Sequence, residues 1–284
     1  MALDIRKGGT LNRVMRTIGI IAGNGVYPET FARAARRQSE EIRLVCIAFD
    51  GETKPEFNEE VDAIKWIKVG QLGKLIDYFV KEGVKEAVMV GQIAPKNLYS
   101  FRPDLRTIKM LARLKERNAE SMFGGIADEM AKDGINLLSA VTFLENDLAG
   151  EGHLFGPKPK DKMEEDAVYG FQIAKECSRL DIGQSVLVRE GTVLAVEAFE
   201  GTNECIKRGG ELGKRKNVTL AKVSKPNQDF RFDVPVIGPL TLETCKTAGV
   251  SQIVVESRCT LILEQKKVAE LAKKYKITIF GKGA

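Results

Sequence analysis

The first 145 residues alternate short apolar runs with amphipathic segments, and this alternation restricts the fold more than any other feature of the chain. Residues 17–23 (TIGIIAG), 43–49 (RLVCIAF) and 86–93 (EAVMVGQI) have the length and continuous hydrophobicity of buried strands. Residues 28–38 and 72–83 have helical periodicity, with Pro28 in the first turn of one helix and Gly83 at the end of the other. Strands separated by helices predict an α/β fold with a mostly parallel sheet and helices packed on it.

Residues 146–161 (NDLAGEGHLFGPKPKD) interrupt this alternation because they are rich in glycine and proline. We therefore predict three parts: an N-terminal α/β lobe at 17–145, a linker at 146–161 and a C-terminal mixed α/β lobe at 162–284. The second lobe contains a predicted hairpin that turns at Glu190–Gly191. The single histidine, His153, falls in the linker and is expected to be a loop residue, which disfavours Ser-His and Cys-His catalysis.

Composition excludes several classes of protein. Hydrophobic residues make up 43% and charged residues 29%, as in a folded globular protein, and no apolar run approaches the roughly 18 to 20 residues needed to cross a bilayer. The five cysteines are far apart and form no CxxC pair, so we expect neither disulfides nor a thiolate zinc site. This cysteine usage fits a protein of the reducing cytoplasm. The net charge of +5 is compatible with anionic substrates but does not establish nucleic-acid binding.

The most basic segment is residues 102–118 (RPDLRTIKMLARLKERN). Leu105, Ile108, Leu111 and Leu114 recur at helical spacing among the basic side chains. This pattern predicts an amphipathic helix that buries the leucine-rich stripe. Its basic residues form either a solvated face or a contact with acidic lipid headgroups.

The segment 225–239 (KPNQDFRFDVPVIGP) places acidic and basic side chains at alternate positions. If residues 229–234 are extended, Asp229, Arg231 and Asp233 share one face of the strand. Two carboxylates in such a row suit Mg²⁺, and Arg231 between them could clamp a phosphate. Lys225 and Gln228 extend the polar row. The alternative is an edge strand that carries a structural ladder of ion pairs.

Three turns that follow strands offer weaker signals. Gly23 and Gly25 allow backbone N–H groups to approach a phosphate at the start of a helix, but the dinucleotide-binding fingerprint and the P-loop are incomplete. Gln92 follows a buried strand. At Gly201 and Thr202 another helix begins, with N–H groups and a hydroxyl that suit an oxyanion.

Five blocks of the sequence resemble a known family. They are IIAGNGVYP, GQIAPKNL, LARLKERNAESMFGGIADEM, LDIGQSVLVREGTVLAVEAFEGTNECI and KPNQDFRFDVPVIGPLT, which look like successive motifs of the LpxI-type UDP-2,3-diacylglucosamine pyrophosphatases. They occur in the same order from Ile18 onward and span nearly the whole chain. The chain departs from the family pattern at Ala119 and Glu120, where an acidic pair is expected, and at Val236, where threonine is expected.

The resemblance implies a Mg²⁺-dependent hydrolase of lipid A biosynthesis that cleaves UDP-2,3-diacylglucosamine to UMP and 2,3-diacylglucosamine 1-phosphate (lipid X). It also implies a Rossmann-like N-terminal lobe, a ligand cleft between the lobes, and peripheral contact with lipids of the inner leaflet of the inner membrane. Asp233 is then the expected catalytic carboxylate, with Asp229 as a second metal-side acid and Arg231 and Lys225 facing the phosphates. The remaining expected substrate contacts are Gly23, Gly25, Gln92, Gln184, Glu197, Glu200, Gly201, Thr202 and Gln228.

Two rival functions are compatible with parts of the sequence. The first lobe alone could belong to a nucleotide-sugar or dinucleotide binding protein or an oxidoreductase, although the third fingerprint glycine is missing. A basic RNA-binding module is the other rival. It is disfavoured because aromatic residues make up only 7% of the chain and are not interleaved with the basic ones.

Overall fold

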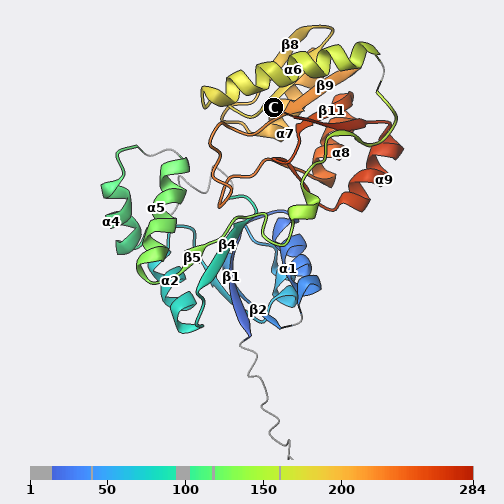
Figure 1. Ribbon diagram of the computed structural model, residues 1–284. Coiled ribbons are helices and arrows are strands. Elements are labelled where there is room, and N and C mark those ends of the chain that lie inside the picture. Colours follow the sequence, from blue (N-terminus) through green and yellow to red (C-terminus); the bar gives the residue numbers. More distant parts are fainter. Residues whose placement is uncertain (1–14, 40, 94–102, 117–118, 160, 284) are drawn as a thin grey trace, which may run out of the picture.

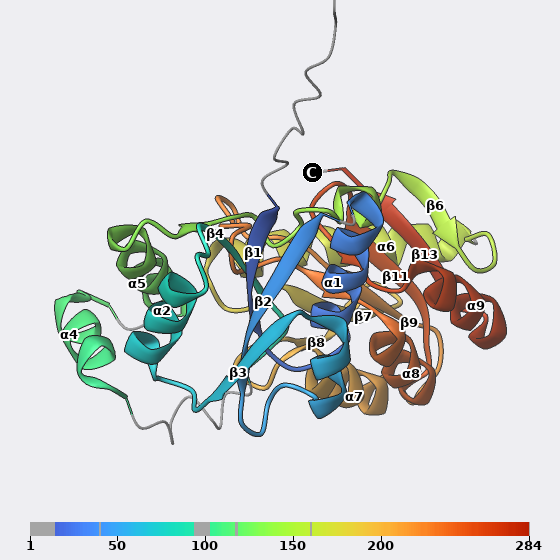
Figure 2. The same ribbon diagram turned by 90° about the horizontal axis from the view of Figure 1, so that it is seen from below.

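The computed structural model describes residues 15–39, 41–93, 103–116, 119–159 and 161–283. Two sheets organise this part of the chain, one in each half of the sequence (Figures 1 and 2). The α/β class predicted from the sequence, with a parallel first sheet and a mixed second sheet, is confirmed. No helix within the described ranges is long and apolar enough to cross a membrane.

The first sheet has the strand order β3-β2-β1-β4-β5, and its strands pair in parallel. The strands are β1 (Arg16–Ala22), β2 (Ile42–Phe49), β3 (Ala63–Ile67), β4 (Glu86–Val90) and β5 (Asn136–Leu137). Helix α1 (Tyr27–Gln38) packs on one face, where Ile18, Ile20 and Phe31 are fully buried. Helices α2 (Leu72–Lys81), α4 (Leu105–Arg113) and α5 (Ala119–Lys132) lie on the other side, and a short 3₁₀ helix spans Pro55–Glu60.

The second sheet has the strand order β6-β13-β11-β9-β7-β8. Its strands are β6 (Gly152–Phe155), β7 (Ser185–Arg189), β8 (Thr192–Val196), β9 (Val218–Lys222), β11 (Val250–Glu256) and β13 (Thr278–Lys282). Helix α6 (Asp161–Arg179) packs on one face, and the other face is covered by α7 (Thr202–Leu212), α8 (Pro239–Ala248) and α9 (Gln265–Tyr275). The predicted hairpin at Glu190–Gly191 is confirmed as β7–β8.

Two local predictions are wrong. The segment 146–161 is not simply a linker, because β6 pairs antiparallel with β13 and His153 lies in this strand rather than in a loop. In α4, the predicted apolar stripe is not the buried face: Leu105 is 66% exposed and Ile108 is 50% exposed, whereas Thr107 and Met110 are buried. The buried face of α4 is set by its contact with α2 and α5, which the period of the leucines alone does not reveal.

The hydrophobic core behind β1 is shared between the two halves of the chain. A short parallel pair, β10 (Val236–Ile237) with β12 (Leu261–Ile262), lies apart from both large sheets. Leu261 is fully buried and Leu263 is 4% exposed, and both belong to the core cluster that contains Ile18 and Phe31. The backbone of Ala140 also donates a hydrogen bond to the Phe230 carbonyl, at 2.7 Å. The two lobes are therefore connected by packing as well as by the chain.

Candidate functional site

Polar side chains gather at one edge of the second sheet. Lys222 ends β9, Ser185 begins the antiparallel strand β7, and Glu197 follows β8, so all three lie at the same edge. Helix α7 begins there at Thr202. The carboxyl ends of parallel strands are where ligands usually bind in open α/β sheets. This edge is therefore the candidate site in the C-terminal half.

The segment 225–235 crosses this edge as a series of turns. The expectation that residues 229–234 form an extended strand is wrong. Asn227 has a positive φ of 59°, and the Asp233 N–H donates to the Asp229 carbonyl at 3.0 Å, which closes a helical type of turn. Side chains in such a turn do not alternate, so the strand argument for Asp229, Arg231 and Asp233 does not apply.

Asp229 and Arg231 form a local ion pair. The Arg231 guanidinium donates to both carboxylate oxygens of Asp229 at 2.6 to 3.1 Å, and the Arg231 backbone N–H donates to Oδ1 at 3.0 Å. The hydrogen bond from Arg231 lowers the pKa of Asp229 below its ordinary value. Both oxygens of this carboxylate are therefore occupied by one neighbouring residue, which leaves it poorly placed for a metal.

Asp233 occupies a different environment. Burial raises the pKa of its carboxyl above the ordinary value, while Lys225, a hydrogen bond from Gln184 and Lys222 act in the opposite direction. The Gln184 Nε2 group donates to Asp233 Oδ2 at 3.3 Å. The Asp229 carboxylate is paired with Arg231, whereas the Asp233 carboxylate accepts its hydrogen bond from Gln184. The described residues contain no cluster of three or more potential metal ligands, and metal binding by Asp233 and Asp229 stays a prediction.

Lys225 lies near Asp233, and Gln228 is held against Lys225. The Lys225 ammonium forms an ion pair with Asp181. Burial lowers its pKa, but the hydrogen bond to Asp181 and the negative charge of Asp233 outweigh this and raise the pKa above the ordinary value. Gln228 accepts a hydrogen bond from the Lys225 backbone N–H at 2.6 Å, while its Nε2 atom is buried without a partner among the described residues. Such an orphaned donor is available to a ligand.

A hydrogen-bonded chain links three side chains at the start of α7. Lys222, which is 7% exposed, donates to the Thr202 hydroxyl at 2.8 Å, and Thr202 donates to Glu197 Oε1 at 2.8 Å. The other Glu197 oxygen is buried without a partner among the described residues. Thr202 and Glu197 were expected at the site from the sequence, but Lys222 was missed. The sequence does indicate Lys222 in one way, because it is the only charged residue of the mainly apolar segment 218–224.

Glu200 and Gly201 have structural roles in this conformation. Glu200 accepts a hydrogen bond from Arg208 at 2.5 Å, which lowers its pKa, and another from the Ala198 backbone at 3.1 Å. Gly201 is the N-cap of α7 and has a φ of 81°, a conformation that favours glycine. Substrate contacts at these two residues stay predictions.

The glycine turn of the first lobe packs against the end of β4. The N–H groups of Gly23 and Gly25 donate to the Val90 carbonyl and to Asn24 Oδ1, and Asn24 and Gln92 form a two-way backbone bridge. A Cβ on Gly23 would lie 2.5 Å from the Gln92 carbonyl oxygen. The close approach of these two loops explains the glycine at 23. Phosphate binding by this turn stays a prediction, and its N–H groups already have partners.

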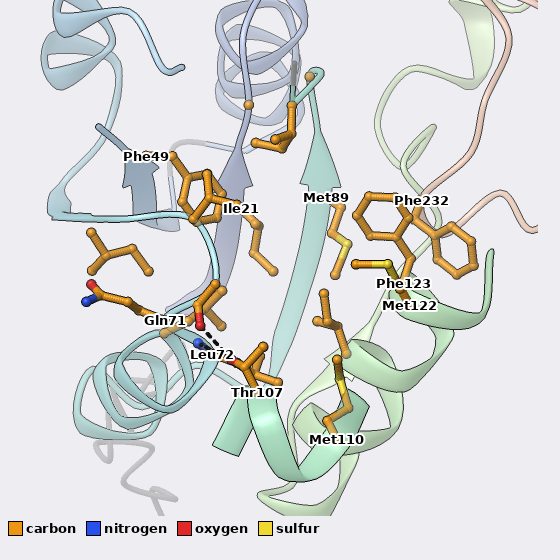
Figure 3. Close-up of a pocket in the computed structure, with 18 of the residues that line it drawn as sticks. Ile21, Phe49, Gln71, Leu72, Met89, Thr107, Met110, Met122, Phe123 and Phe232 are labelled. Carbon is orange, nitrogen blue, oxygen red and sulfur yellow. Dashed lines mark hydrogen bonds between the residues drawn. The ribbon is translucent and has the colours of Figure 1, made fainter. Parts of the chain in front are cut away.

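An apolar pocket lies beside this turn, between the first sheet and helices α2, α4 and α5 (Figure 3). Its cavity volume is about 160 Å³, and its lining is mainly aliphatic, aromatic and methionine side chains. Figure 3 shows Met89, Met110, Met122, Phe123 and Phe232 around it. The sequence alone does not reveal this pocket, because its walls come from segments far apart in the chain.

Phe232 connects the pocket with the polar site. Its ring stacks on Phe123 of α5, with centroids 5.5 Å apart and an interplanar angle of 28°. The next residue, Asp233, lies in the polar cluster with Gln184. Glu120, also on α5, is close enough to raise the pKa of Asp233. An apolar cavity and a charged cluster therefore adjoin across two consecutive residues, at a place where both halves of the chain contribute.

Comparisons with known proteins match this two-part organisation. The LpxI N-terminal domain family matches residues 17–146, and the LpxI C-terminal domain family matches residues 150–280. The chain is 29% identical over 280 residues to the UDP-2,3-diacylglucosamine pyrophosphatase LpxI of Caulobacter vibrioides, an alignment that covers 94% of this chain and 98% of that protein.

Solved structures show only remote similarity. The biotin carboxylase subunit of pyruvate carboxylase is 14% identical, with a TM-score of 0.27 over 66% of this chain and 39% of that chain. The biotin carboxylase domain of Hydrogenobacter thermophilus 2-oxoglutarate carboxylase is 14% identical, with a TM-score of 0.26 over 70% of this chain and 41% of that chain. The chain thus spans about two fifths of each carboxylase, and similarity at this level carries no conclusion. The two LpxI domain families, by contrast, match nearly the whole chain in order, and the chain belongs to the LpxI family.

Proposed function

We propose that this protein hydrolyses the pyrophosphate bond of UDP-2,3-diacylglucosamine to UMP and 2,3-diacylglucosamine 1-phosphate, as a step of lipid A biosynthesis. The observation that carries the proposal is the junction at Phe232 and Asp233, where the apolar pocket meets the charged cluster. A diacylated nucleotide sugar has this same division, because its acyl chains are apolar and its pyrophosphate is anionic. The name of the Caulobacter vibrioides relative agrees with this substrate.

The acyl portion of the substrate would occupy the pocket between the first sheet and α5. About 25 cal/mol is gained for each Å² of apolar surface removed from water, so an apolar cavity favours an acyl chain strongly over a polar group. The stacked rings of Phe123 and Phe232 lie at its border with the polar site. This arrangement would place the sugar and pyrophosphate of the substrate next to Asp233.

In the reaction, water adds to one phosphorus, the bridging P–O bond breaks, and the oxygen of that bond leaves with the other phosphate. Gln184 holds one oxygen of Asp233, so the carboxylate has a defined orientation toward the site. Its raised pKa makes it a better proton acceptor than an ordinary aspartate. Lys225, which keeps its charge through Asp181, would stabilise negative charge that develops on the phosphates.

Mg²⁺ fits this site only as an ion shared with the substrate. Protein-bound Mg²⁺ usually retains several waters and takes one or two carboxylates plus phosphate oxygens, and Asp233 can supply one such ligand. Asp229 is left out of the proposed metal site because Arg231 occupies both of its oxygens. When bound, the ion would neutralise charge on the pyrophosphate. Asp233 would either hold the ion or orient the attacking water.

The test is UMP release from UDP-2,3-diacylglucosamine by wild type and Asp233→Asn across a Mg²⁺ titration, with EDTA as the metal-free point. We expect metal-dependent release by wild type and at least about a hundredfold loss in the variant, a typical contribution of acid–base catalysis. If Asp233 holds the ion, excess Mg²⁺ partly restores the variant. If it orients water, the Mg²⁺ dependence is unchanged. Variant turnover within a few-fold of wild type contradicts both roles, and no release by wild type contradicts the substrate.

The proposal extends to location, with the protein in the cytoplasm and in peripheral contact with the inner leaflet. Helix α4 contributes Met110 to the pocket and exposes Leu105 and Ile108 on its outer side, next to Lys109. Exposed apolar side chains beside basic ones favour an anionic bilayer surface. We expect co-sedimentation with vesicles that contain an anionic phospholipid, reduced in Ile108→Glu. Equal binding by this variant would exclude α4 as the contact.

A further inference from the structure

Lys175 and Lys222, in the C-terminal half, have side chains that are partly and almost fully buried, and they are paired differently. Lys175 donates to both oxygens of Glu256, at 2.9 and 3.1 Å, and to the Ser224 carbonyl at 3.2 Å. Lys222 is more deeply buried, at 7% exposure, and donates to two hydroxyls, Thr202 Oγ1 at 2.8 Å and Ser185 Oγ at 3.4 Å. Among the described residues no carboxylate oxygen lies within 4.0 Å of the Lys222 ammonium.

No direct ion pair compensates for the charge on Lys222. A buried ammonium is destabilising by several kcal/mol unless an opposite charge or a full set of hydrogen bonds compensates for it. Lys175 meets that condition through Glu256. Lys222 has neutral hydroxyl partners for two of its three N–H donors. A charge kept in such a place is typical of a functional site.

The position of Lys222 indicates that its charge serves to bind an anion. It ends β9 at the sheet edge where Asp233 lies, and its positive charge lowers the pKa of that carboxyl. Thr202, which accepts its hydrogen bond, is the first residue of α7, a helix of 11 residues whose N-cap is a glycine with no side-chain cap. The first N–H groups of such a helix carry partial positive charge. The ammonium and the helix start thus add positive potential at one point.

We propose that Lys222 binds a non-bridging oxygen of the substrate's pyrophosphate, with Thr202 and Ser185 holding its ammonium in position; this inference rests on the proposed function. Lys222 makes no ion pair with a carboxylate of the described residues, whereas the ammonium of Lys225 is already paired with Asp181. The ligand class is a phosphoryl oxyanion, and a charged donor in a dry site binds it more strongly than it would in water. Lys222 is therefore a substrate-binding residue in addition to those expected from the sequence.

The binding test uses inorganic pyrophosphate as the probe, measured by isothermal titration calorimetry with the full-length protein. Lys222→Met keeps the length of the side chain and removes the charge. We expect its affinity to fall at least about tenfold, since a hydrogen bond to a charged group is typically worth about 1.5 to 3 kcal/mol. Lys207→Met is the matched control, because Lys207 is an exposed lysine of α7 that pairs with Glu204. Its affinity should stay within about twofold of wild type.

A stability measurement separates a binding role from a structural one. If Lys222 serves the ligand, Lys222→Met has an unchanged or higher Tm, because a buried charge without a direct ion pair is removed. Lys175→Met is the contrast and should lower the Tm, since it leaves Glu256 buried without its partner. A lower Tm for Lys222→Met together with wild-type pyrophosphate affinity overturns the proposal, as does a wild-type protein that binds no pyrophosphate.

The two proposals fail in different ways. If wild type binds pyrophosphate through Lys222 but releases no UMP from UDP-2,3-diacylglucosamine, the phosphate site stands and the substrate is wrong. If wild type releases UMP and Lys222→Met retains both pyrophosphate affinity and the KM of wild type, the hydrolase stands and Lys222 has no part in it. Lys222→Arg, which restores a positive charge, should recover part of the pyrophosphate affinity.

Discussion

Glu256 lies at the end of β11 and is held by four hydrogen bonds. Its side chain is 4% exposed, and its carboxylate accepts two bonds from Lys175 at 2.9 and 3.1 Å. The backbone N–H and the hydroxyl of Ser224 each donate to it at 2.7 Å. Glu256→Gln keeps the shape of the side chain, but it removes the charge opposite Lys175 and can place an NH₂ donor against the donors of Ser224.

We expect this substitution to lower the free energy of unfolding by about 3 kcal/mol. Breaking a buried ion pair from one side typically costs about 3 to 5 kcal/mol, and the lower end applies here because Lys175 keeps 28% of its side-chain exposure. In a protein of this size each kcal/mol shifts the Tm by roughly 2 °C, which gives a decrease of about 6 °C. Differential scanning calorimetry and urea unfolding both measure this change.

Glu176→Gln is the matched control, because Glu176 is the residue after Lys175 and pairs with Arg179 at the surface, where the Glu176 side chain is 67% exposed. Exposed pairs typically contribute about 0.2 to 1 kcal/mol, so its Tm should change by no more than about 2 °C. The double variant Lys175→Met with Glu256→Gln should lose less stability than the sum of the single losses. A Glu256→Gln protein within 1 kcal/mol of wild type would show that this buried pair does not hold the segment after β9 in place.

Three further substitutions have expected outcomes. Phe232→Ala should raise the KM for UDP-2,3-diacylglucosamine and hardly change cleavage of unacylated UDP-glucosamine, because it removes a wall of the apolar pocket; equal effects on both substrates would contradict this. Asp233→Asn should raise the Tm at pH 7. The pKa of Asp233 is higher in the folded than in the unfolded protein, where it is about 3.9, so its ionisation at pH 7 destabilises the fold. Asparagine does not ionise and avoids this loss. Below the unfolded pKa the carboxyl is protonated in both states, so the gain in Tm should vanish in acid. Gly23→Ala should lower the Tm by several degrees, because its Cβ would lie 2.5 Å from the Gln92 carbonyl oxygen, whereas Gly124→Ala meets nothing within 4 Å and should not.

The sequence predicted the order of strands and helices well, because buried strands and amphipathic helices have local signals. It did not predict the conformation of residues 225–235. Alternation of side chains applies only to an extended chain, and the Pro226–Asn227 pair, typical of turns, indicated otherwise. In the structure Asn227 has a positive φ, and the two aspartates have separate surroundings.

The site was predicted in part, and the missing part is tertiary. Asp233, Gln184, Thr202 and Lys225 were placed near one another from sequence, and the structure does bring them to one edge of the second sheet. The apolar pocket was not predicted, because no single segment contains its walls. The buried face of α4 was not predicted either, because it depends on contacts with other helices that the sequence of α4 alone does not reveal.

The position of Leu261 and Leu263 in the core behind β1 affects how this protein is made. The ribosome releases the first sheet long before residue 261 is synthesised, so the N-terminal core stays incomplete until almost the end of translation. Contacts this distant in sequence also slow folding, because a long loop must close before they form. A nascent chain stopped near residue 150 should therefore expose an apolar patch that chaperones can bind, and the two halves should mature together.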